Sequence, residues 1–551
     1  MARVSLNRLS GRRRAVLAAL ALFAGLGAAL ALAAVGGLLE GRPEGIEVPA
    51  GPPGTGSIAD VVEFQPFAFE DSDPDELLER GSDGYSHPLY EFSPGGAGAS
   101  AARVTRFRSR IAAAAERHEV EVDTLEALVM LESAGRPAVA AGDDPDGAVG
   151  LGQILPETAT SLLGMSVDLE VSKRLTRAIE REGLRTRRAG ARSRSAQRGA
   201  PAGARRRARR AVQIRRAAPA RIARLERRRR AVDERYDPAR SLDGAARYLA
   251  IAEGALGRED LAVVSYHMGI GNLEQVIEAY VRPARPRRKV RATVEAYDVS
   301  YAGIFYDSSP VENARTYRLL ADFGDDSRSY LLRVEAAREI MRLHRDDPSE
   351  LSRLERLHAM APSGELVLRP PDETDSLRDP EAMTEAFDDG ELIALPDDPQ
   401  RLGFTLDPAL GGLRAGGEGK PDPRLYRSLR PEAVSALLYI TKEVDRVAGQ
   451  SGLRVTDAAR DEAYGRRLAA KGQDRGEPPP AVSPHSSGFS FDIARDYASP
   501  REGRAFAFVL ERLRALRVID YAYEDEEIHI TAGEDAEQLL ELQEELVPAR
   551  G

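Results

Sequence analysis

The chain of 551 residues contains no cysteine. This absence excludes disulfide bonds, thiolate metal ligands, cysteine nucleophiles and lipid attachment through cysteine. Any metal site must therefore draw its ligands from histidine, aspartate and glutamate. Histidine is scarce as well, because the chain has only seven, so each one can be considered as a candidate ligand.

Acidic residues are nearly missing from one stretch. Residues 172–235 hold 24 basic and only 5 acidic residues, a local charge of +19, whereas the rest of the chain carries −29. The formal net charge of −10 therefore conceals an acidic protein with one strongly basic insertion. Such an asymmetry has to be interpreted locally, because the total charge describes neither part.

Charge is absent altogether from residues 15–39, a run of 25 residues. As a helix this run spans about 37 Å, more than the roughly 30 Å of a bilayer's hydrocarbon core. Five arginines precede it, which by the positive-inside rule keeps the N-terminus cytoplasmic and exports the rest. A signal peptide cleaved near residues 31–33 is the alternative, but the length favours an uncleaved anchor. We expect a single-pass protein of the cell membrane with its bulk on the cell-wall side, secreted if the segment is cleaved.

The length predicts about three or four modules with linkers between them. Composition and apolar periodicity give their order along the chain. The segments are a cytoplasmic tail and transmembrane anchor (1–40), a flexible linker (41–100), an all-α domain (101–345) with an Arg-rich insertion (172–235), a second linker region (346–427) and a C-terminal α+β domain (428–540). The fold class is therefore multidomain, with a membrane helix, a helical domain and a mixed domain.

A candidate acid lies in the helical domain. Apolar residues recur at helical spacing over 125–131 and lead to Glu132. A carboxyl against an apolar wall has a raised pKa, so it can hold a proton at neutral pH and act as a general acid. By itself a glutamate at a helix end is most often a solvated residue.

The residues around Glu132 carry more information. Glu132-Ser133 is followed, in order, by Gly147-Ala148-Val149-Gly150-Leu151-Gly152-Gln153, Tyr236-Asp237-Pro238, Gly244-Ala245-Ala246-Arg247-Tyr248-Leu249 and Ser265-Tyr266-His267-Met268-Gly269. This series resembles the soluble lytic transglycosylase family over about residues 101–170 and 236–345. The resemblance implies a lysozyme-like fold and cleavage of peptidoglycan between N-acetylmuramic acid and N-acetylglucosamine, with no cofactor.

In that family one glutamate does the chemistry, and Glu132 matches it. It would protonate the leaving oxygen and then, as a base, help the sugar's own 6-hydroxyl close a 1,6-anhydro ring. A single carboxylate then suffices, whereas ordinary glycosidases need a pair. Ser133, Gln153 and Tyr266 are the substrate-binding candidates of the sugar groove.

Two residues depart from the family pattern, because Gly152 stands where methionine is usual and His267 where asparagine is usual. These departures affect the groove and leave the acid in place. A hydrolytic muramidase is an alternative if Asp143, Asp144 or Asp146 supplies a second carboxylate, although such Asp-Gly clusters usually form turns.

A second constellation lies near the C-terminus. His485 and Asp492 are seven residues apart, and His529 follows the acidic pair Glu526-Glu527 and Ile528. Two histidines and a carboxylate make a catalytic zinc set with one position left for water. A nearby glutamate can take a proton from that water.

These residues resemble the Ser-x-His-x-x-Gly-x-Ala-x-Asp and Glu-x-x-His motifs of zinc D-Ala-D-Ala carboxypeptidases of the M15 type, which share the Hedgehog fold. The resemblance covers about residues 428–535 and implies four roles. It implies zinc ligands His485, Asp492 and His529, the general base Glu526, a substrate-binding Ser483, and Arg460 as a clamp on the peptide's terminal carboxylate.

Three details complicate this second site. Ser490 stands where alanine is commoner, and Gly465 stands where the family often has glutamine. In a regular strand Glu526 and His529 would face opposite sides, so an irregularity is expected between them. A metal-free binding module is the alternative.

The basic insertion interrupts the two halves of the transglycosylase-like domain. An exported domain has little access to nucleic acid, so we expect none as a partner. Anionic lipid headgroups or phosphates of wall polymers are the expected partners, and a solvated, partly disordered loop is the alternative. Together the patterns predict a membrane-anchored bacterial enzyme that cuts peptidoglycan glycan strands and, with zinc, stem peptides. A non-catalytic cell-wall-binding scaffold is the rival hypothesis.

Overall fold

The computed structural model describes residues 64–69, 72–143, 145–194, 202–281, 289–410, 422–470 and 484–547. Their contacts form two compact units. The described part of unit 1 falls within Ala99–Ile270 and Gly324–Asp326, and that of unit 2 within Arg42–Gly98, Gly271–Phe323 and Ser327–Gly551. The membrane anchor predicted at 15–39 lies outside the described residues, and within them no helix has the length and apolarity needed to cross a membrane.

Unit 1 is helical. Its helices are α6 (Ala97–Thr105), α7 (Arg108–His118), α8 (Val122–Ser133), α9 (Leu169–Arg194), α10 (Ala202–Val232), α11 (Pro238–Leu256) and α12 (Glu259–Met268). α11 packs against both α7 and α12. The Asp237 side chain caps its first turn, with Pro238 at the first helical position, and Gly257 ends it at a φ of 88°. α8 is buried on nearly all sides, which suits its apolar sequence.

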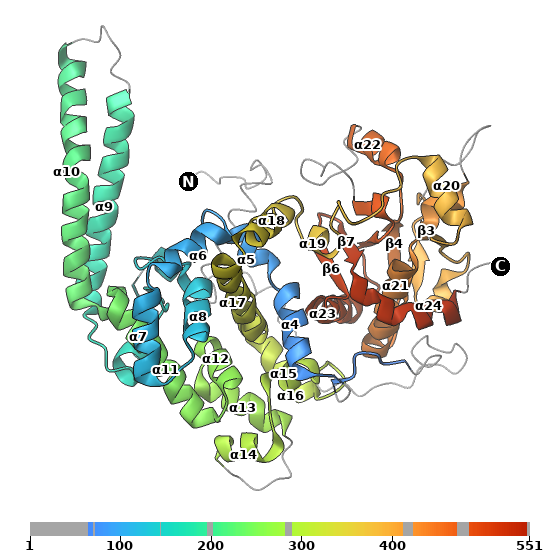
Figure 1. Ribbon diagram of the computed structural model, residues 1–551, viewed down its shortest axis with the longest axis horizontal. Helices are drawn as coiled ribbons and strands as arrows, with labels where there is room; N and C mark the ends of the chain where they lie inside the picture. Colours follow the sequence, from blue (N-terminus) through green and yellow to red (C-terminus); the bar gives the residue numbers. More distant parts are fainter. Residues whose placement is uncertain are drawn as a thin grey trace. The chain divides into compact units, whose positions relative to one another are not determined.

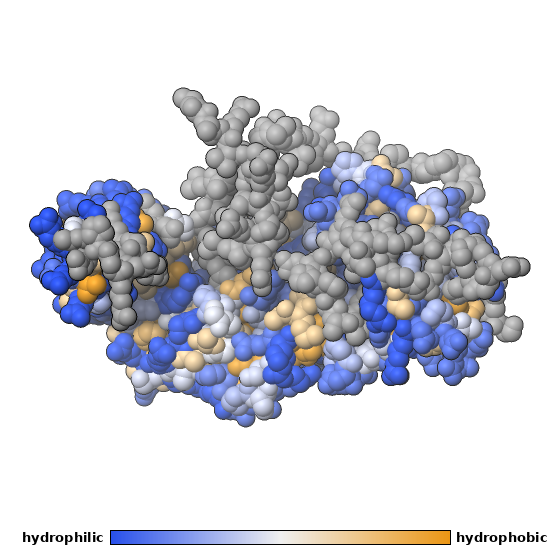
Figure 2. All heavy atoms as spheres, turned by 90° about the horizontal axis from the view of Figure 1, so that it is seen from above, coloured by the Kyte–Doolittle hydropathy of each residue, from blue (hydrophilic) through white to orange (hydrophobic). Residues whose placement is uncertain are grey.

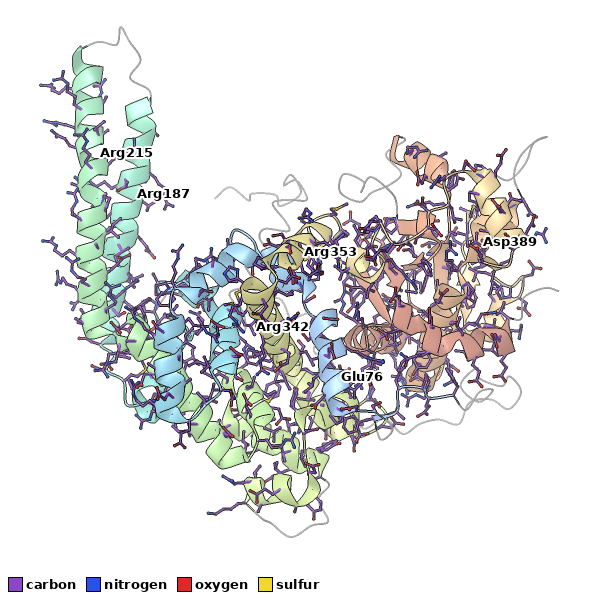
Figure 3. The ribbon with its side chains drawn as sticks, in the orientation of Figure 1. Glu76, Arg187, Arg215, Arg342, Arg353 and Asp389 are labelled. Atoms are coloured by element: carbon purple, nitrogen blue, oxygen red, sulfur yellow. The ribbon has the colours of Figure 1, made fainter. Side chains whose placement is uncertain are left out.

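The basic insertion forms a helical hairpin, with α9 and α10 side by side (Figure 1). Small buried residues line the contact, among them Ala189, Ala211 and Ala218. Arg187 projects from α9 and Arg215 from α10 in Figure 3, and hydrophilic residues dominate the hairpin where it is seen end-on at the left of Figure 2. The described residues of the insertion are thus two helices rather than a disordered loop, because alanine and arginine are strong helix formers even without an apolar stripe.

Unit 2 contains a five-stranded sheet in the order β2-β4-β5-β7-β6. The strands are β2 (Phe404–Leu406), β4 (Leu453–Asp457), β5 (Ser490–Ala494), β6 (Ile519–Tyr523) and β7 (Glu527–Ala532). β2 runs parallel to β4, and the other pairs are antiparallel. Helix α21 (Pro431–Ala448) packs against α23 (Pro500–Ala515). The C-terminal region is therefore α+β, as the sequence predicts.

Unit 2 also contains helices and a strand pair that lie outside this sheet, most of them from earlier parts of the chain. They are α4 (Pro74–Gly84), α5 (His87–Phe92), α13 (Ile270–Tyr280), α14 (Val290–Tyr297), α15 (Tyr301–Tyr306), α16 (Ala314–Asp322), α17 (Tyr330–Asp346), α18 (Pro348–His358), α19 (Glu365–Leu368), α20 (Pro380–Asp388), the two-stranded pair β1 (Ile393–Ala394) and β3 (Ser428–Leu429), α22 (Glu462–Ala470) and α24 (Leu540–Leu546).

Both predicted linkers therefore contain folded elements. In 41–100, Asp73 caps α4 and the side chains of Leu77, Leu89 and Tyr90 are buried. In 346–427, α18, α19 and α20 are formed, and Leu351, Leu366 and Met383 are buried. Their acidic and Pro-rich composition conceals short, capped helices with a few buried apolar residues each. The predicted boundary at residue 345 also does not coincide with a unit boundary, because most of 271–345 lies in unit 2.

Candidate functional site

Glu132 lies in the last turn of α8 and is partly buried. The helix ends at Ala134, which has a left-handed φ of 50°. Tyr266 of α12 faces the same place: burial raises the pKa of Tyr266 well above its usual value, and the negative charge of Glu132 raises it further. Tyr266 therefore keeps its proton at neutral pH and lies close enough to Glu132 for their charges to interact.

The segment 145–154, which carries Gln153, is held by a buried cation. The guanidinium of Arg235, fully buried beside Asp233, donates to the carbonyl oxygens of Pro145 at 2.9 Å, Gly147 at 3.1 Å and Ile154 at 3.2 Å. At Gly150, whose φ is 83°, an added Cβ would lie 1.9 Å from the Arg235 carbonyl oxygen. The glycine at this position is therefore required both by its conformation and by this close approach.

Gly152 and Gln153 lie in the same segment, shortly after Gly150. Gln153 has a left-handed φ of 43°, unusual for a residue with a side chain, and its amide donates to the carbonyl of Gly150 at 2.9 Å. The Tyr266 hydroxyl donates to the carbonyl of Gly152 at 2.6 Å. A Cβ on Gly152 would meet that hydroxyl at 2.9 Å and the Cβ of Ala245 at 3.1 Å. The departure at Gly152 thus leaves the space that the tyrosine hydroxyl occupies.

Three other predicted residues are engaged elsewhere. The Ser133 side chain is fully buried, and its hydroxyl donates to the Val129 carbonyl at 3.0 Å inside α8, so this hydroxyl points into the core and not into a groove. His267 lies 3.7 Å from the Asp325 carboxylate. Asp146 is paired with Lys173 at 2.6 Å, while Asp144 lies outside the described residues.

The three predicted metal ligands meet in unit 2. His485 lies in the short 3₁₀ turn Pro484–Ser487, Asp492 on β5 and His529 on β7, where Asp492 and His529 are directly paired across the strands. His529 Nδ1 is 2.7 Å and His485 Nε2 3.3 Å from Asp492 Oδ1. All three side chains are buried, and their ligand atoms lie within 4.8 Å of one another. This donor set is the one that a tetrahedral zinc site uses.

Each histidine has an acceptor on its outer nitrogen. His485 Nδ1 donates to the Ala458 carbonyl at 3.0 Å, and His529 Nε2 donates to Glu365 Oε2 of α19 at 2.8 Å. These bonds leave His485 Nε2 and His529 Nδ1 as the nitrogens directed at Asp492. No sequence signal singled out Glu365, which lies within the predicted linker 346–427.

The charges of the cluster are strongly coupled. Burial opposes the charge of Asp492, but the neighbouring His485 and His529 outweigh it and hold the pKa of Asp492 well below its usual range. Burial likewise opposes protonation of His529, but Glu365 and Asp492 raise its pKa well above the ordinary value. The two histidines thus stabilise the negative charge of Asp492, and Asp492 and Glu365 stabilise a positive charge on His529.

Two glutamates precede His529. Glu527 opens β7 and shares a strand face with His529, two residues on. Burial and the charges of Asp492 and Asp457 raise its pKa to about 7. Glu526 precedes the strand, in the turn that joins β6 to β7, and its carbonyl accepts from the Arg495 amide at 2.9 Å. Glu526 lies in this turn, before the regular strand pairing of β7 begins at Glu527, and Glu527 is a second carboxylate for the role of base.

Arg460 lies next to this cluster. It is buried, its Nη1 donates to Asp457 Oδ2 at 3.0 Å, and its amide donates to the His485 carbonyl at 3.2 Å. Asp457 is in turn paired with Asp492 across β4 and β5. Ser483 lies outside the described residues.

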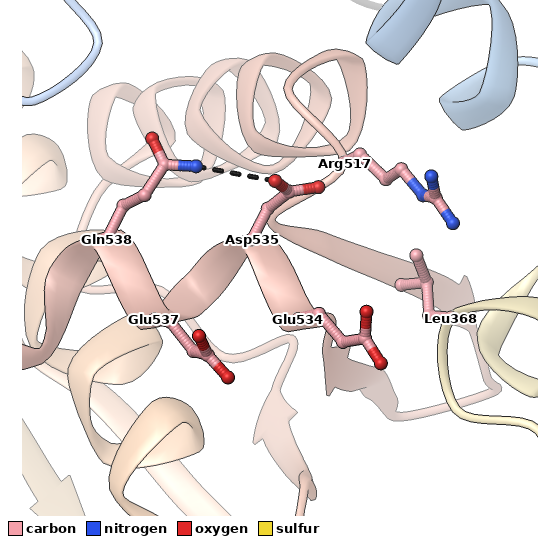
Figure 4. A pocket seen from close by; sticks show the side chains of 6 residues that line it. All are labelled: Leu368, Arg517, Glu534, Asp535, Glu537 and Gln538. Carbon is pink, nitrogen blue, oxygen red and sulfur yellow. Dashed lines mark hydrogen bonds between the residues drawn. The ribbon is translucent and has the colours of Figure 1, made fainter. Parts of the chain in front are cut away.

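Two cavities in unit 2 are lined by other residues. One, of about 310 Å³, is lined by Leu368, Arg517, Glu534, Asp535, Glu537 and Gln538 (Figure 4). The other, of about 240 Å³, has Tyr90, His358 and Asp520 in its wall. None of the residues predicted for either site lines these two cavities.

Comparison with known proteins gives one match. Residues 109–176 and 211–285 match the family model described as "Transglycosylase SLT domain". The match is interrupted over residues 177–210, which include most of α9 and the first turns of α10. No curated protein and no solved structure matches the chain. The chain thus carries a transglycosylase SLT domain, which supports peptidoglycan lytic transglycosylase activity on glycan strands of the cell wall.

Proposed function

We propose that this chain is a two-site peptidoglycan-remodelling enzyme, in which unit 1 cleaves the glycan strand with formation of a 1,6-anhydro end. The pair of Glu132 and Tyr266 carries this proposal. Tyr266 holds its proton, because burial and Glu132 raise its pKa, and Glu132 lies within the matched transglycosylase segment, at the position of the family's catalytic glutamate. Glu132 would protonate the leaving glycosidic oxygen and then accept the proton of the 6-hydroxyl.

Digestion of purified sacculi tests this first activity. The native chain should release fragments that lack the water which hydrolysis adds, as mass spectrometry resolves, and Glu132→Gln should abolish their release. Glu126→Gln is the matched control, because Glu126 is a buried glutamate of the same helix that binds Arg108 and takes no part in the chemistry. Hydrated products would favour the muramidase, and cleavage by Glu132→Gln would contradict the mechanism.

Unit 2 is proposed as a zinc peptidase acting on stem peptides, as a D,D-carboxypeptidase or endopeptidase. The residues fit the metal: three buried donors converge, and both histidines have their outer nitrogens bonded. When bound, zinc supplies a Lewis acid that lowers the pKa of a water molecule. Glu526 or Glu527 would hold the proton released there, and Arg460 would orient the peptide's terminal carboxylate.

Metal analysis of the full chain tests this second site. We expect about one zinc per native chain and loss of it in His485→Ala. His344→Ala is the control, because His344 lies on α17, outside the cluster. If the native chain holds no zinc after dialysis against a zinc-containing buffer, the result would favour the non-catalytic scaffold.

The proposed location of the enzyme is the outer side of the cell membrane, where residues 15–39 would anchor it. The α9/α10 hairpin would bind partners that carry phosphate groups. The charge of residues 172–235, +19, supports an anionic partner. Membrane fractionation of the tagged chain tests the anchor: extraction by alkaline carbonate would contradict it.

A further inference from the structure

The metal cluster has a buried neighbour with no assigned role. Glu365 begins the short helix α19, and only 2% of the residue is exposed. Its Oε2 lies 2.8 Å from His529 Nε2 and accepts from the Thr531 hydroxyl at 3.0 Å. A buried carboxylate requires such donors, because its desolvation is otherwise costly. Both donors come from β7, so Glu365 is bound to the strand that carries the proposed ligand.

We propose that Glu365 is a positioning residue of the metal centre, holding the His529 ring so that Nδ1 faces Asp492 and His485. This inference rests on the proposed zinc site. A ring that donates its Nε2 proton to Glu365 has only Nδ1 to offer to a metal, and it cannot rotate without losing that bond. Carboxylates that accept from a ligating histidine fix its tautomer and increase its basicity in this way.

The position of Glu365 is itself fixed by a contact of the preceding residue. The amide of Gly364 donates to Asp520 Oδ2 of β6 at 2.6 Å, and the other oxygen of Asp520 accepts from Arg514 Nε at 2.7 Å. A Cβ on Gly364 would lie 2.6 Å from Asp520 Oδ2, so a larger residue here would displace this carboxylate. α19 is thereby bound to the sheet.

Behind Glu365 a row of hydroxyls continues the network. Thr531 is paired with Ser490 across β7 and β5, and their hydroxyls lie 2.8 Å apart. Ser490, which departs from the alanine usual in the resembled motif, therefore supports the threonine that donates to Glu365. This departure from the motif extends the hydrogen-bond network of the site.

His485 provides an internal comparison. Its outer nitrogen is bonded to a backbone carbonyl, that of Ala458, at 3.0 Å. The two rings are thus held by the same kind of contact, but a backbone acceptor cannot be removed by substitution. Glu365 is the acceptor that a side-chain change can test.

The experiment measures zinc affinity of the full-length chain by competition with a chromophoric chelator, and the visible spectrum of the Co²⁺-substituted chain. Glu365→Gln keeps the size but loses the charge, and Glu365→Leu loses the acceptor. We expect zinc binding weakened about tenfold in the first and up to about 100-fold in the second, with shifted Co²⁺ bands. Glu502→Gln is the matched control: Glu502 is a buried carboxylate that accepts from the amides of Gly452 and Ala498, and its loss should leave the zinc affinity unchanged.

The outcomes separate this inference from the proposed function. If the native chain binds zinc and Glu365→Gln binds it equally well, with an unchanged Co²⁺ spectrum, Glu365 has no positioning role. If the native chain binds no zinc, the zinc site itself is refuted. Circular dichroism establishes that each variant is folded, and should Glu365→Leu not fold, Glu365→Gln decides.

Discussion

Arg235 shows how much of the transglycosylase-like site depends on one buried side chain. It belongs to the basic stretch by sequence, yet it is the cation around which residues 145–154 are arranged. Its ion pair with Asp233 is fully buried, and Asp233 also accepts from the Ser172 hydroxyl at 2.7 Å. Breaking such a pair leaves an uncompensated charge in the core.

We therefore expect Arg235→Met to lower the free energy of unfolding by about 3–5 kcal/mol. Urea denaturation followed by circular dichroism measures the loss, and hydrogen exchange should increase over residues 145–154. Arg228→Met, at an exposed position on α10, should change stability by less than about 0.5 kcal/mol. Equal effects of the two substitutions would contradict the role given to Arg235.

A second residue-scale prediction concerns acid. His358 is stacked on Tyr90 and bonded to His87 at 2.9 Å. Burial and then the charge of His87 lower the pKa of His358 to about 3. In the unfolded chain this histidine has its ordinary pKa of about 6.5, so below that pH the unfolded chain binds a proton that the folded chain does not bind. The free energy of unfolding therefore falls as the pH falls from about 6.5 towards 3.

His358→Gln should flatten this acid limb, so that urea midpoints between pH 4 and 7 depend less on pH than in the native chain. His344→Gln, on the neighbouring α17, should keep the native slope. An unchanged slope in His358→Gln would show that the buried imidazole is not the group responsible.

At the scale of elements, the helical hairpin is the part that sequence patterns describe least well. Its charge was predictable, because it is a count of residues. Its helical form was not predicted, because its buried side consists largely of small residues such as Ala189, Ala211 and Ala218. Polar contacts at its base fix the pairing of α9 with α10: Arg221 binds Glu182 at 2.9 Å, and Arg229 binds Thr176 at 3.1 Å and lies over the Tyr236 ring.

This pairing allows a clean truncation. Residues 183–220 contain 13 arginines and no acidic residue, and Glu182 and Arg221, which flank them, are in contact. Replacing 183–220 by a short Gly-Ser turn should abolish salt-sensitive binding to anionic vesicles or to polymer-bearing walls, and leave cleavage of polymer-free glycan unchanged. Co-sedimentation at low and high salt measures the binding. Retained binding would refute the role of the hairpin.

The candidate metal site contains residues that the sequence predicts and residues that it does not. The clustering of His485, Asp492 and His529 was predictable because these residues lie in two short motifs, and β5 and β7 then pair Asp492 with His529. Glu365 was not, because it reaches His529 from 164 residues away in sequence. Glu527 could have been found, since strand alternation places it on the face of His529. Local patterns thus identify the candidate ligands, whereas the outer partners of these residues depend on tertiary packing.

At the scale of the whole molecule, unit 2 is assembled from three distant stretches of chain. The Tyr306 hydroxyl donates to the carbonyls of Leu77 at 2.9 Å and Ala515 at 2.8 Å. The guanidinium of Arg512, on α23, donates to the carbonyls of Phe305 and Ser308, both at 2.8 Å. Burial lowers the pKa of Arg512 to about 10, so it stays charged at neutral pH and needs these acceptors.

A fragment of residues 428–551, which contains the predicted C-terminal domain (428–540), should therefore not reproduce the proposed zinc site. It lacks β2, which pairs with β4, it lacks Glu365, and it leaves Arg512 without the carbonyls of Phe305 and Ser308. We expect weak or no zinc binding and broad, non-cooperative thermal unfolding by circular dichroism. The full chain is the reference, and a fragment with native zinc affinity and a sharp transition would show that the sheet and its metal site are independent of the preceding helices. Because each missing contact is a buried polar one, the loss of stability should exceed the loss caused by removing an exposed helix of similar length.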